Sequence, residues 1–396
     1  MLTPRTIIVQ NLLFIFLILF VATGCGQAPA KESTKHSSTD SVAVLYAPDF
    51  TFSPLSPADV DAYRQAVDEY YNKHLKATGF NGAILVAKNG EIVFEDYKGY
   101  INFKTKELIT PETPFHLASI SKTFTGMTIL KLWEEGRISL NDDLLKYFPQ
   151  LPYHGVTIKM LLSHRSGLPN YLNFMDSFWN KKQRATNQDV VNYMIVHKPK
   201  IEYLPGRSYH YNNTNFMLLA LVIEQITHQS YPKYMLDSVF TPLGLKNTYV
   251  FSSKDTPNYV PTYIGNWPYP MDHLDCTYGD KNIYSTVRDL FAWDKALYQH
   301  TFVKASTLQL AFAPQSNERR SMHNYGLGWH LYFNNGDTIV YHNGKWHGET
   351  NTFTRVIQQY ATIIILGNKH NANIFAAKNM SSIFNGRIAD TTKFEE

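Results

Sequence analysis

Strand-like hydrophobic runs lie near both ends of the chain, and hydrophobic positions with helical spacing fill the long part between them. Toward the N-terminus, 83–87 and 92–97 are strand-like and are joined at Asn89-Gly90, a pair of residues typical of a tight hairpin turn. Toward the C-terminus, the strand-like runs are 326–332, 338–342, 351–356 and 362–367. The pattern predicts an α+β fold in which one antiparallel sheet is built from both chain ends, is flanked by helices, and carries an inserted, mainly helical lobe.

Helical spacing sets the expected limits of the domain and its lobes. The expected helical segments are 57–78, the mainly helical stretch 130–245 with its apolar run 216–226, 287–298 and 373–384. We expect one folded domain over 46–390, with a sheet lobe made of about 46–118 and 283–390 and a helical lobe of about 119–282. A cleft should lie between the two lobes.

A further helix, from Ser119 to about Glu135, carries apolar residues on every side when successive residues are placed about 100° apart. These residues are Ile120, Phe124, Met127, Ile129, Leu130, Leu132 and Trp133. A helix with this pattern is buried. Lys122 lies one turn after Ser119, and a buried lysine needs a partner. The Ser119 hydroxyl is the natural partner, because side chains at i and i+3 meet on one helix face.

Ser119 and Lys122 fit the chemistry of a nucleophile and its activating base. A serine hydroxyl reacts poorly until a neighbour takes its proton, and a desolvated ammonium loses its own proton readily enough to become that neighbour. Free backbone N–H groups at a helix start also suit a developing oxyanion. The spacing alone is not specific, because S-x-x-K arises by chance in chains of this length and recurs here from Ser230 to Lys233.

Tyr211 and Asn213 lie in a loop that leads into the apolar run 216–226. A phenol there could relay protons, and an amide could hold a substrate carbonyl or amide nitrogen. Each residue also has an ordinary explanation. Y-x-N recurs at 70–72, 171–173 and 332–334, and asparagine is a common turn or cap residue.

The stretch His342-Asn343-Gly344-Lys345 follows the last part of the strand-like run 338–342. Local rules place a hairpin turn at Asn343-Gly344, which would leave His342 as a strand-end residue without chemistry. The stretch gains a functional meaning only beside the two motifs that precede it.

The three motifs in this order, S-x-x-K at Ser119, Y-x-N at Tyr211 and H-x-G at His342, resemble those of a family of serine hydrolases. The family includes class C β-lactamases, D-alanyl-D-alanine carboxypeptidases, and related esterases and D-aminopeptidases, which are similar to penicillin-binding proteins. The resemblance covers roughly 58–386 and extends to stretches without catalytic residues, at 83–90, 161–169, 242–245, 283–286 and 325–329. It implies a β-lactamase/transpeptidase-like fold and a hydrolase that needs neither cofactor nor metal.

The resemblance also implies a role for each matching residue. Ser119 would be the acylated nucleophile, Lys122 its general-base partner, and Tyr211 the phenol that passes protons to the leaving group and back from water. The implied substrate-binding residues are Asn213, His342, Asn343, Gly344 and Lys345. The backbone N–H groups of Ser119 and Lys345 would form the oxyanion hole. The implied reaction is hydrolysis of a D-amino-acid peptide, an amide or a small ester through an acyl-enzyme.

His342 departs from the pattern of the β-lactamases, which carry Lys-Thr-Gly at this point. The lysine there is a permanent cation that helps to hold the substrate carboxylate. A histidine has an unperturbed pKa of about 6.5 and does not guarantee that charge. The departure favours a peptidase, amidase or esterase over a dedicated β-lactamase. The α/β-hydrolase elbow G-x-S-x-G is absent from the sequence, which argues against that rival class.

Two other classes of function stay open at this point. A non-catalytic protein of this fold could bind cell-wall fragments or β-lactams as a sensor, although such a protein usually loses one of Ser119, Lys122 and Tyr211. A metal-dependent hydrolase is disfavoured, because the 15 histidines contain no H-E-x-x-H or similar ligand spacing. The histidines expected to be scattered surface or cleft residues are His164, His210, His347 and His370.

The N-terminus has the pattern of a signal peptide over 1–24, in which Arg5 precedes an apolar run at 12–22. That run is shorter than the about 20 residues of a membrane span. The small residues before Cys25 resemble a bacterial lipobox, so Cys25 is the expected lipidation site. The segment 25–45 has the composition of a flexible tether, and some 20 such residues reach roughly 25 Å. We expect a lipid-anchored protein of the bacterial cell envelope that faces the periplasm; an ordinary secretory signal or an uncleaved anchor, with Cys25 incidental, is the alternative.

Charge limits the choice of partners. The chain has 37 Lys and Arg residues against 33 Asp and Glu, a formal net charge of +4 that is spread over its length. The tight basic clusters are Lys181-Lys182 and Arg319-Arg320, which is too little for a nucleic-acid surface. The expected partners are a small-molecule or peptide substrate of cell-wall origin and the membrane, which the lipid on Cys25 would reach.

Overall fold

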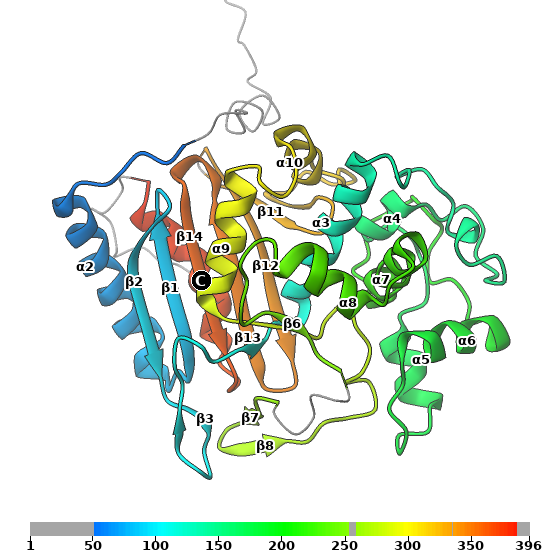
Figure 1. Cartoon of the computed structure of the whole chain (residues 1–396), viewed down its shortest axis with the longest axis horizontal. Helices are drawn as coiled ribbons and strands as arrows, with labels where there is room; N and C mark the ends of the chain where they lie inside the picture. The colour runs from blue at the N-terminus through cyan, green and yellow to red at the C-terminus, as the bar shows by residue number, and fades with distance from the viewer. Residues whose placement is uncertain (1–50, 253–258, 335, 386–396) are drawn as a thin grey trace, which may run out of the picture. The chain divides into compact units, whose positions relative to one another are not determined.

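The computed structural model of the chain describes residues 51–252, 259–334 and 336–385. Within these residues the main sheet has seven strands in the order β10-β11-β12-β13-β14-β1-β2, with antiparallel neighbours (Figure 1). The strands are β1 Gly82–Lys88, β2 Glu91–Lys98, β10 His323–Tyr325, β11 His330–Asn334, β12 Asp337–Trp346, β13 Glu349–Val356 and β14 Ala361–Gly367. Ile84 of β1 lies opposite Ile365 of β14. The prediction of one sheet built from both ends of the domain is therefore confirmed.

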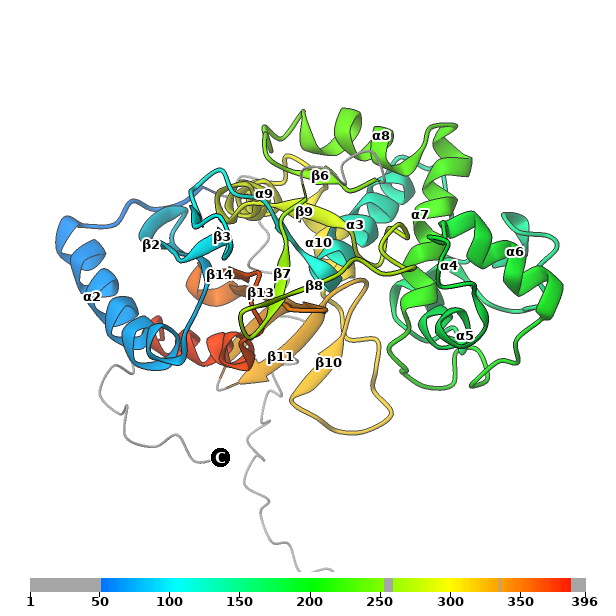
Figure 2. The ribbon, with the colours of Figure 1, turned by 90° about the horizontal axis from the view of Figure 1, so that it is seen from below.

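Helices cover both faces of this sheet and fill the segment inserted between its two halves. The helices are α2 Pro57–His74, α3 Ser121–Glu134, α4 Ile158–Leu162, α5 Tyr171–Phe178, α6 Asn187–His197, α7 Asn213–Thr227, α8 Tyr231–Met235, α9 Val287–Tyr298, α10 Ala305–Ala311 and the 3₁₀ helix η7 Ala372–Ile383. Figure 2 shows α2 on one side of the strands and α9 on the other. The α+β class with an inserted helical part is confirmed.

Alternate residues of the central strands pack into two hydrophobic cores. Ile84 and Ile365 belong to a core that also contains residues of α2 and η7. Leu85 and Ile364 belong to the larger core, which contains residues of α3 and α9. Because side chains alternate between the faces of a strand, both faces of β1 and β14 are buried.

Smaller sheets complete the fold around the main one. One pairs β3 Tyr100–Asn102 with β4 Glu107–Leu108, and another pairs β7 Thr262–Ile264 with β8 Trp267–Tyr269. In the third, β9 Ile283–Ser285 lies between β5 Phe115–His116 and β6 Tyr249–Val250. The β5–β9 pairing matters for the site, because β5 ends at His116, three residues before Ser119.

The hairpin at Asn89-Gly90 forms as expected, with φ values of 50° and 73° that a type I′ turn requires. The alternative turn at Asn343-Gly344 is wrong, because β12 continues to Trp346 and pairs with β13 throughout. The expected strand at 326–332 begins later, at His330. Gly326 and Gly328 instead carry the backbone close to neighbouring segments, where Leu327 N–H donates to Ala311 and Gly328 N–H donates to Leu162.

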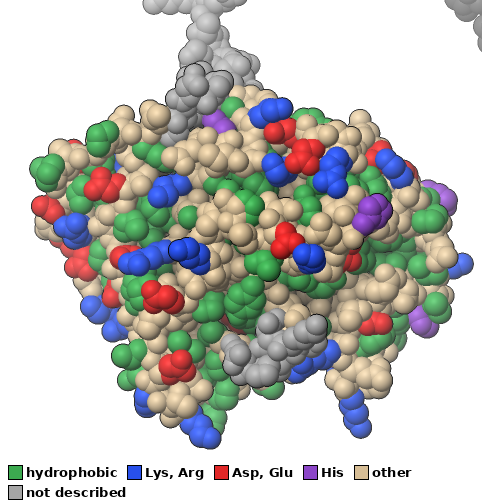
Figure 3. Space-filling model, in the orientation of Figure 1, with side chains coloured by type: hydrophobic (Ala, Val, Ile, Leu, Met, Phe, Trp, Pro, Cys, Tyr) green, Lys and Arg blue, Asp and Glu red, His purple; other side chains and the backbone are tan. Residues whose placement is uncertain are grey.

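The predicted signal peptide at 1–24, the lipidation site Cys25 and the tether at 25–45 lie outside the described residues. Among the residues that the structure does describe, none of the helices is long and apolar enough to cross a membrane. Lys, Arg, Asp and Glu side chains are interspersed over the face of the molecule in Figure 3.

Candidate active site

Ser119 lies in a short 3₁₀ helix, Ala118–Ile120, that leads directly into α3. Residues from Ser121 to Leu130 are all buried, as the apolar pattern on every side of this helix predicts. Ala118 has a φ of 49°, a left-handed value that is costly for a residue with a side chain. Leu117 N–H donates to the carbonyl of Ile283 at 2.8 Å and ties this strained turn to β9. The turn presents Ser119 at the start of a rigid helix.

Gly344 explains how the third motif reaches Ser119. Its backbone is not in the left-handed region, so glycine is needed here because it has no side chain and not because of its φ value. A Cβ at this position would lie 2.2 Å from the carbonyl oxygen of Leu117 and 3.3 Å from the Cβ of Ala118. Only glycine allows β12 to approach the backbone on which Ser119 is carried.

Lys122 is fully buried, and its ammonium group donates hydrogen bonds to three partners. Its Nζ donates to Ser119 Oγ at 3.1 Å, to Asn213 Oδ1 at 2.8 Å and to the carbonyl oxygen of Asp280 at 2.8 Å. Burial lowers the pKa of Lys122 to about 8, although the negative charge of Asp280 raises it in part. A lysine with this pKa can give up its proton near neutral pH. The predicted contact between Ser119 and Lys122 is present.

Tyr211 lies beside both Lys122 and Ser119. Its ring centre is 5.0 Å from Lys122 Nζ. Burial raises the pKa of its phenol, and a hydrogen bond with Ser119 acts in the opposite direction. The residue as a whole is 36% exposed, so Tyr211 borders both Ser119 and solvent. A phenol with a raised pKa keeps its proton at neutral pH and can donate it.

Asn213 is the first residue of α7, while its neighbour Asn212 is the helix cap and accepts a hydrogen bond from Thr214 N–H. The cap explanation considered for Asn213 therefore applies to Asn212. Asn213 instead directs its Oδ1 at Lys122. At the start of α7, Asn212 therefore caps the helix and Asn213 contacts Lys122 in the site.

His342 is 1% exposed and stays neutral. Its Nδ1 donates to the carbonyl oxygen of Asn343 at 2.8 Å, and its ring centre lies 4.9 Å from that of His330. Burial, followed by the charges of His330 and Lys122, holds the pKa of His342 well below its usual range. Burial likewise lowers the pKa of His330 to about 4. Neither histidine supplies a fixed positive charge at pH 7.

His164 was expected to be a surface or cleft residue, and that expectation is wrong for this histidine. It is fully buried, and its Nδ1 accepts the backbone N–H of Asn212 at 3.1 Å. Its ring centre lies 4.3 Å from that of Tyr211. His164 therefore holds the loop that carries Tyr211 and Asn213. It lies two residues after the last residue of α4, and no local pattern points to this role.

Most of these residues line a cavity of about 390 Å³. The expected site residues that line it are Ser119, Tyr211, Asn213, His342, Asn343 and Lys345. Lys122 lies behind Ser119, and Gly344 lies against the turn beside it. The lining residues that the sequence did not single out are Ala118, Leu172, Tyr209, Asp280, Lys281, His330, Trp346 and Phe375. Ala118 and Trp346 adjoin the first and third motifs, whereas the others follow no motif and are brought to the cavity only by the fold.

Asp272, Asp275 and His347 could in principle offer ligands to a metal ion, since their side-chain atoms lie within 4.8 Å of one another. Hydrogen bonds already account for the cluster. His347 Nε2 lies 3.1 Å from Asp275 Oδ1, which also accepts from Trp346 Nε1 at 2.6 Å, while Asp275 Oδ2 accepts from Asp272 N–H at 2.7 Å. The cluster is separate from the catalytic contacts of Ser119, and its spacing matches no metal motif in the sequence.

Comparisons with known proteins show the family to which the chain belongs. The family model described as Beta-lactamase matches residues 67–379 of the chain. Penicillin-binding protein 4* of Bacillus subtilis (strain 168) is 32% identical over 308 residues, which are 73% of this chain and 68% of that protein. Protein flp of Staphylococcus aureus (strain MRSA252) is 27% identical over 350 residues, which are 83% of this chain but less than two thirds (65%) of that relative.

Solved structures show the same fold at lower sequence identity. The penicillin binding protein from Bacillus halodurans has a TM-score of 0.69 at 21% identity, and the match covers 81% of this chain and 98% of that one. The octameric penicillin-binding protein homologue from Pyrococcus abyssi has a TM-score of 0.68 at 22% identity, with coverages of 82% and 77%. EstCE1, a hydrolase with promiscuous acyltransferase activity, has a TM-score of 0.69 at 17% identity, with coverages of 82% and 98%.

Proposed function

Because the chain belongs to the beta-lactamase family, whose members are serine hydrolases, we propose that it is an exported hydrolase that forms an acyl-enzyme on Ser119. Its substrates are a D-amino-acid peptide, an amide or a small ester. The observation that carries the proposal is the contact between Ser119 Oγ and the buried Lys122, whose pKa is lowered to about 8. A buried lysine of this kind is an effective base for a serine hydroxyl.

Acylation begins from the neutral form of Lys122. The Ser119 Oγ forms a bond to the substrate carbonyl carbon while its proton passes to Lys122 Nζ. The phenol of Tyr211 then gives a proton to the leaving nitrogen or oxygen, the bond to the leaving group breaks, and Tyr211 recovers a proton from the Lys122 ammonium. Water attacks the acyl carbon by the reverse set of transfers, and the acid product leaves Ser119 free.

The developing oxyanion is bound by the backbone N–H groups of Ser119 and Lys345. The close approach of β12 to the Leu117–Ala118 backbone supports this assignment, because it brings the strand that carries Lys345 beside Ser119. Asn213 holds the substrate amide or carbonyl and keeps Lys122 in place through its Oδ1.

The neutral state of His342 favours a peptidase, amidase or esterase over a dedicated β-lactamase. At this position the β-lactamases of the family carry a lysine, and a histidine with a pKa well below its usual range adds no positive charge. β-Lactams can still acylate Ser119, since acylation needs the nucleophile and its base rather than this cation.

Export and anchoring complete the proposal. The signal peptide at 1–24, lipidation of Cys25 and the tether at 25–45 would hold the enzyme at the bacterial envelope, facing the periplasm and its cell-wall substrates. Growth of an expressing bacterium with labelled palmitate tests the anchor. The wild-type chain should incorporate label, and Cys25→Ser should not; equal labelling of both would rule out Cys25.

The nucleophile is tested by intact-protein mass spectrometry after incubation with a fluorophosphonate and, separately, with a penicillin. Digestion should locate the adduct on Ser119, and Ser119→Ala should give none while keeping the wild-type circular dichroism spectrum. The lifetime of the penicillin adduct separates a slow peptidase-like enzyme from a β-lactamase. A folded wild-type protein without an adduct from either reagent would favour a non-catalytic sensor of cell-wall fragments or β-lactams.

A further inference from the structure

We propose that His116 and Asn351 are positioning residues for the reaction at Ser119. Their side chains hold the turn that carries Ser119 at a fixed distance from β12, and so set the spacing of the two backbone N–H groups of the oxyanion hole. The proposal rests on the proposed function, because it names residues that support the same reaction. Neither residue lines the Ser119 cavity or belongs to one of the three motifs.

His116 ends β5 and lies three residues before Ser119. The strand pairs with β9 through two residues, Phe115 opposite Ser285 and His116 opposite Tyr284. A pairing this short supplies few backbone hydrogen bonds, so the position of the turn after it depends on other contacts. His116 takes part in two of these contacts, one through its backbone and one through its ring.

Asn351 makes the backbone contact. It is fully buried in β13, where its Nδ2 donates to the carbonyl oxygen of His116 at 2.9 Å and its Oδ1 accepts the N–H of Gly367 at 3.0 Å. One amide therefore joins β14 of the main sheet to the end of β5, and both of these bonds are to backbone groups. Because its donor and its acceptor are both used, the amide has one orientation, which fixes the distance between the two segments.

The same amide lies where β12 passes the Ser119 turn. Asn351 is opposite Gly344 in the pairing of β13 with β12, and a Cβ on Gly344 would lie 3.2 Å from Asn351 Nδ2. That Cβ would also lie 2.2 Å from the carbonyl oxygen of Leu117. Lys345 follows Gly344 on β12. The Asn351 amide thus sets how close the backbone that leads to Ser119 comes to the strand that carries the Lys345 N–H.

The ring of His116 makes the second contact. Its Nε2 lies 2.8 Å from Asn282 Oδ1, while the backbone nitrogen of Asn282 is farther away, at 3.2 Å. The Asn282 amide is held by its Nδ2, which donates to the carbonyl oxygens of Asp275 and Thr277 at 2.7 Å each. Its Oδ1 therefore faces the ring, and His116 Nε2 carries the proton of this contact. Burial lowers the pKa of His116 to about 4, although the charge of Asp275 raises it in part, so the ring is neutral at pH 7.

Asn282 belongs to the segment that holds the catalytic lysine. Two residues before it, the carbonyl oxygen of Asp280 accepts a hydrogen bond from Lys122 Nζ at 2.8 Å. His116 thus ties the backbone before Ser119 to the segment that anchors Lys122. Nucleophile, base and oxyanion hole then keep one relative geometry, which matters because a displacement of about 1 Å costs up to about a hundredfold in rate.

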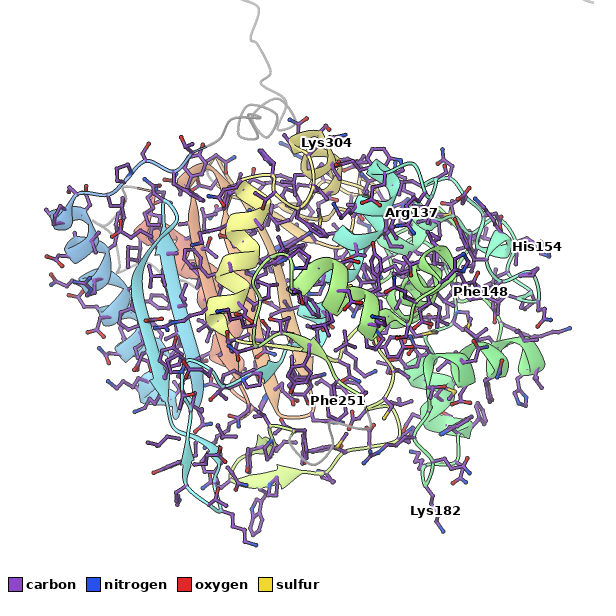
Figure 4. All side chains as sticks on the ribbon, in the orientation of Figure 1. Arg137, Phe148, His154, Lys182, Phe251 and Lys304 are labelled. Carbon is purple, nitrogen blue, oxygen red and sulfur yellow. The ribbon has the colours of Figure 1, made fainter. Side chains whose placement is uncertain are left out.

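A small cavity beside this contact shows how near the pair is to the site. His116 and Asn282 line it together with Phe251, which is labelled in Figure 4, and its volume is about 20 Å³. Trp346 lines both this cavity and the Ser119 cavity. Trp346 therefore lies between the two cavities, and His116 acts on the site from behind it.

The test separates positioning from simple stabilisation of the fold, and it uses the purified full-length chain. Asn351→Ala removes the bridge, and Asn81→Ala is the matched control. Asn81 is also buried, and its Nδ2 donates to the carbonyl oxygen of Tyr100 at 2.9 Å while its Oδ1 accepts the N–H of Tyr100 at 2.8 Å. Both variants should melt at a lower temperature than the wild type, because each loses buried hydrogen bonds. The values of kcat and KM are measured for a p-nitrophenyl ester below both melting transitions.

Asn351→Ala should lower kcat roughly 10- to 100-fold and change KM by less than about threefold, because the oxyanion hole acts on the transition state more than on the bound ester. Asn81→Ala should keep the wild-type kcat. The infrared stretch of the acyl carbonyl is then measured in the acyl-enzyme formed with a carbon-13-labelled ester. It should move to higher frequency in Asn351→Ala and stay unchanged in Asn81→Ala, since the hydrogen bonds to that oxygen are weakened only in the first.

A second pair of variants tests His116 and does not depend on how Asn351→Ala folds. His116→Gln keeps an N–H for Asn282 Oδ1 and should retain most of kcat, whereas His116→Leu has none and should lower kcat roughly tenfold. A wild-type kcat and carbonyl frequency in Asn351→Ala, or equal kcat in His116→Gln and His116→Leu, would overturn the positioning role. A wild-type chain that gives no fluorophosphonate adduct on Ser119 would instead overturn the proposed function.

Discussion

The reactivity of Ser119 should depend on pH through Lys122. Burial lowers the pKa of this lysine to about 8, and its neutral form is the one that accepts the serine proton. At pH 7 roughly a tenth of the molecules carry neutral Lys122, and at pH 9 roughly nine tenths do. The rate constant for acylation should therefore rise about tenfold per pH unit below pH 8 and level off above it.

Asp280→Asn tests the sign of this argument. The carbonyl oxygen of residue 280, which accepts from Lys122 at 2.8 Å, is retained in the variant, while the side-chain negative charge is removed. Because that charge raises the pKa of Lys122, its loss should lower the pKa and move the rise in rate to lower pH. Asp237→Asn is the control, since Asp237 forms an exposed ion pair with Lys233.

The assay is the second-order rate constant of fluorophosphonate labelling, or kcat/KM for a neutral p-nitrophenyl ester, measured between about pH 5.5 and about pH 9.5. The profile of the free enzyme then reports the pKa of the base. A rise that continues without a plateau to the pKa of an ordinary lysine would refute the role of burial. A shift of the Asp280→Asn profile to higher pH would refute the assigned electrostatics.

Three other substitutions test separate parts of the site. Tyr211→Phe should lower kcat roughly 10²- to 10⁴-fold with little effect on stability, measured by steady-state kinetics and thermal melting, and unchanged turnover would remove Tyr211 from the mechanism. Gly344→Ala places a Cβ 2.2 Å from the Leu117 carbonyl oxygen, so fluorophosphonate labelling of Ser119 should slow at least about tenfold. Gly136→Ala is the control, because Gly136 has a left-handed backbone but no atom within 4 Å of the added Cβ. It should lower the free energy of unfolding by about 1–2 kcal/mol and leave labelling intact. His342→Lys should raise the preference for carboxylate-bearing substrates, measured as the ratio of kcat/KM for matched substrates with and without a free carboxylate. An unchanged ratio would show that position 342 does not face the carboxylate.

The fold was predictable where a strong local pattern agreed with the final packing. The hairpin at Asn89-Gly90 forms because both residues adopt the left-handed φ values that its turn needs. The helix after Ser119 is buried on all sides, and its apolar pattern already required this. The pairing of β1 with β14 could be proposed only as a general arrangement, since residues about 280 positions apart leave no local signal of their register.

The candidate site was predictable through its motifs but not through its supporting contacts. Asn343-Gly344 has the local chemistry of a turn, yet Gly344 serves to let β12 pass against Leu117, and the turn follows at His347-Gly348. His164 supports the loop of Tyr211 from a position that its neighbours in sequence do not distinguish. Such roles depend on which backbones the fold brings together, and a single sequence does not contain that information in local form.

The pKa of Lys122 depends on which charges lie near it in the cavity. Lys122 can act as a base only while its surroundings keep its pKa low, and the buried, neutral His330 and His342 keep that environment apolar without adding a fixed charge. A lysine at position 342 would bring a permanent cation near Lys122 and lower its pKa further. His342 adds no such charge, so the pKa of Lys122 is set mainly by burial and in part by Asp280. The pH profile of Ser119 labelling in His342→Lys should therefore lie at lower pH than that of the wild type, and an unchanged profile would contradict this account of the Lys122 pKa.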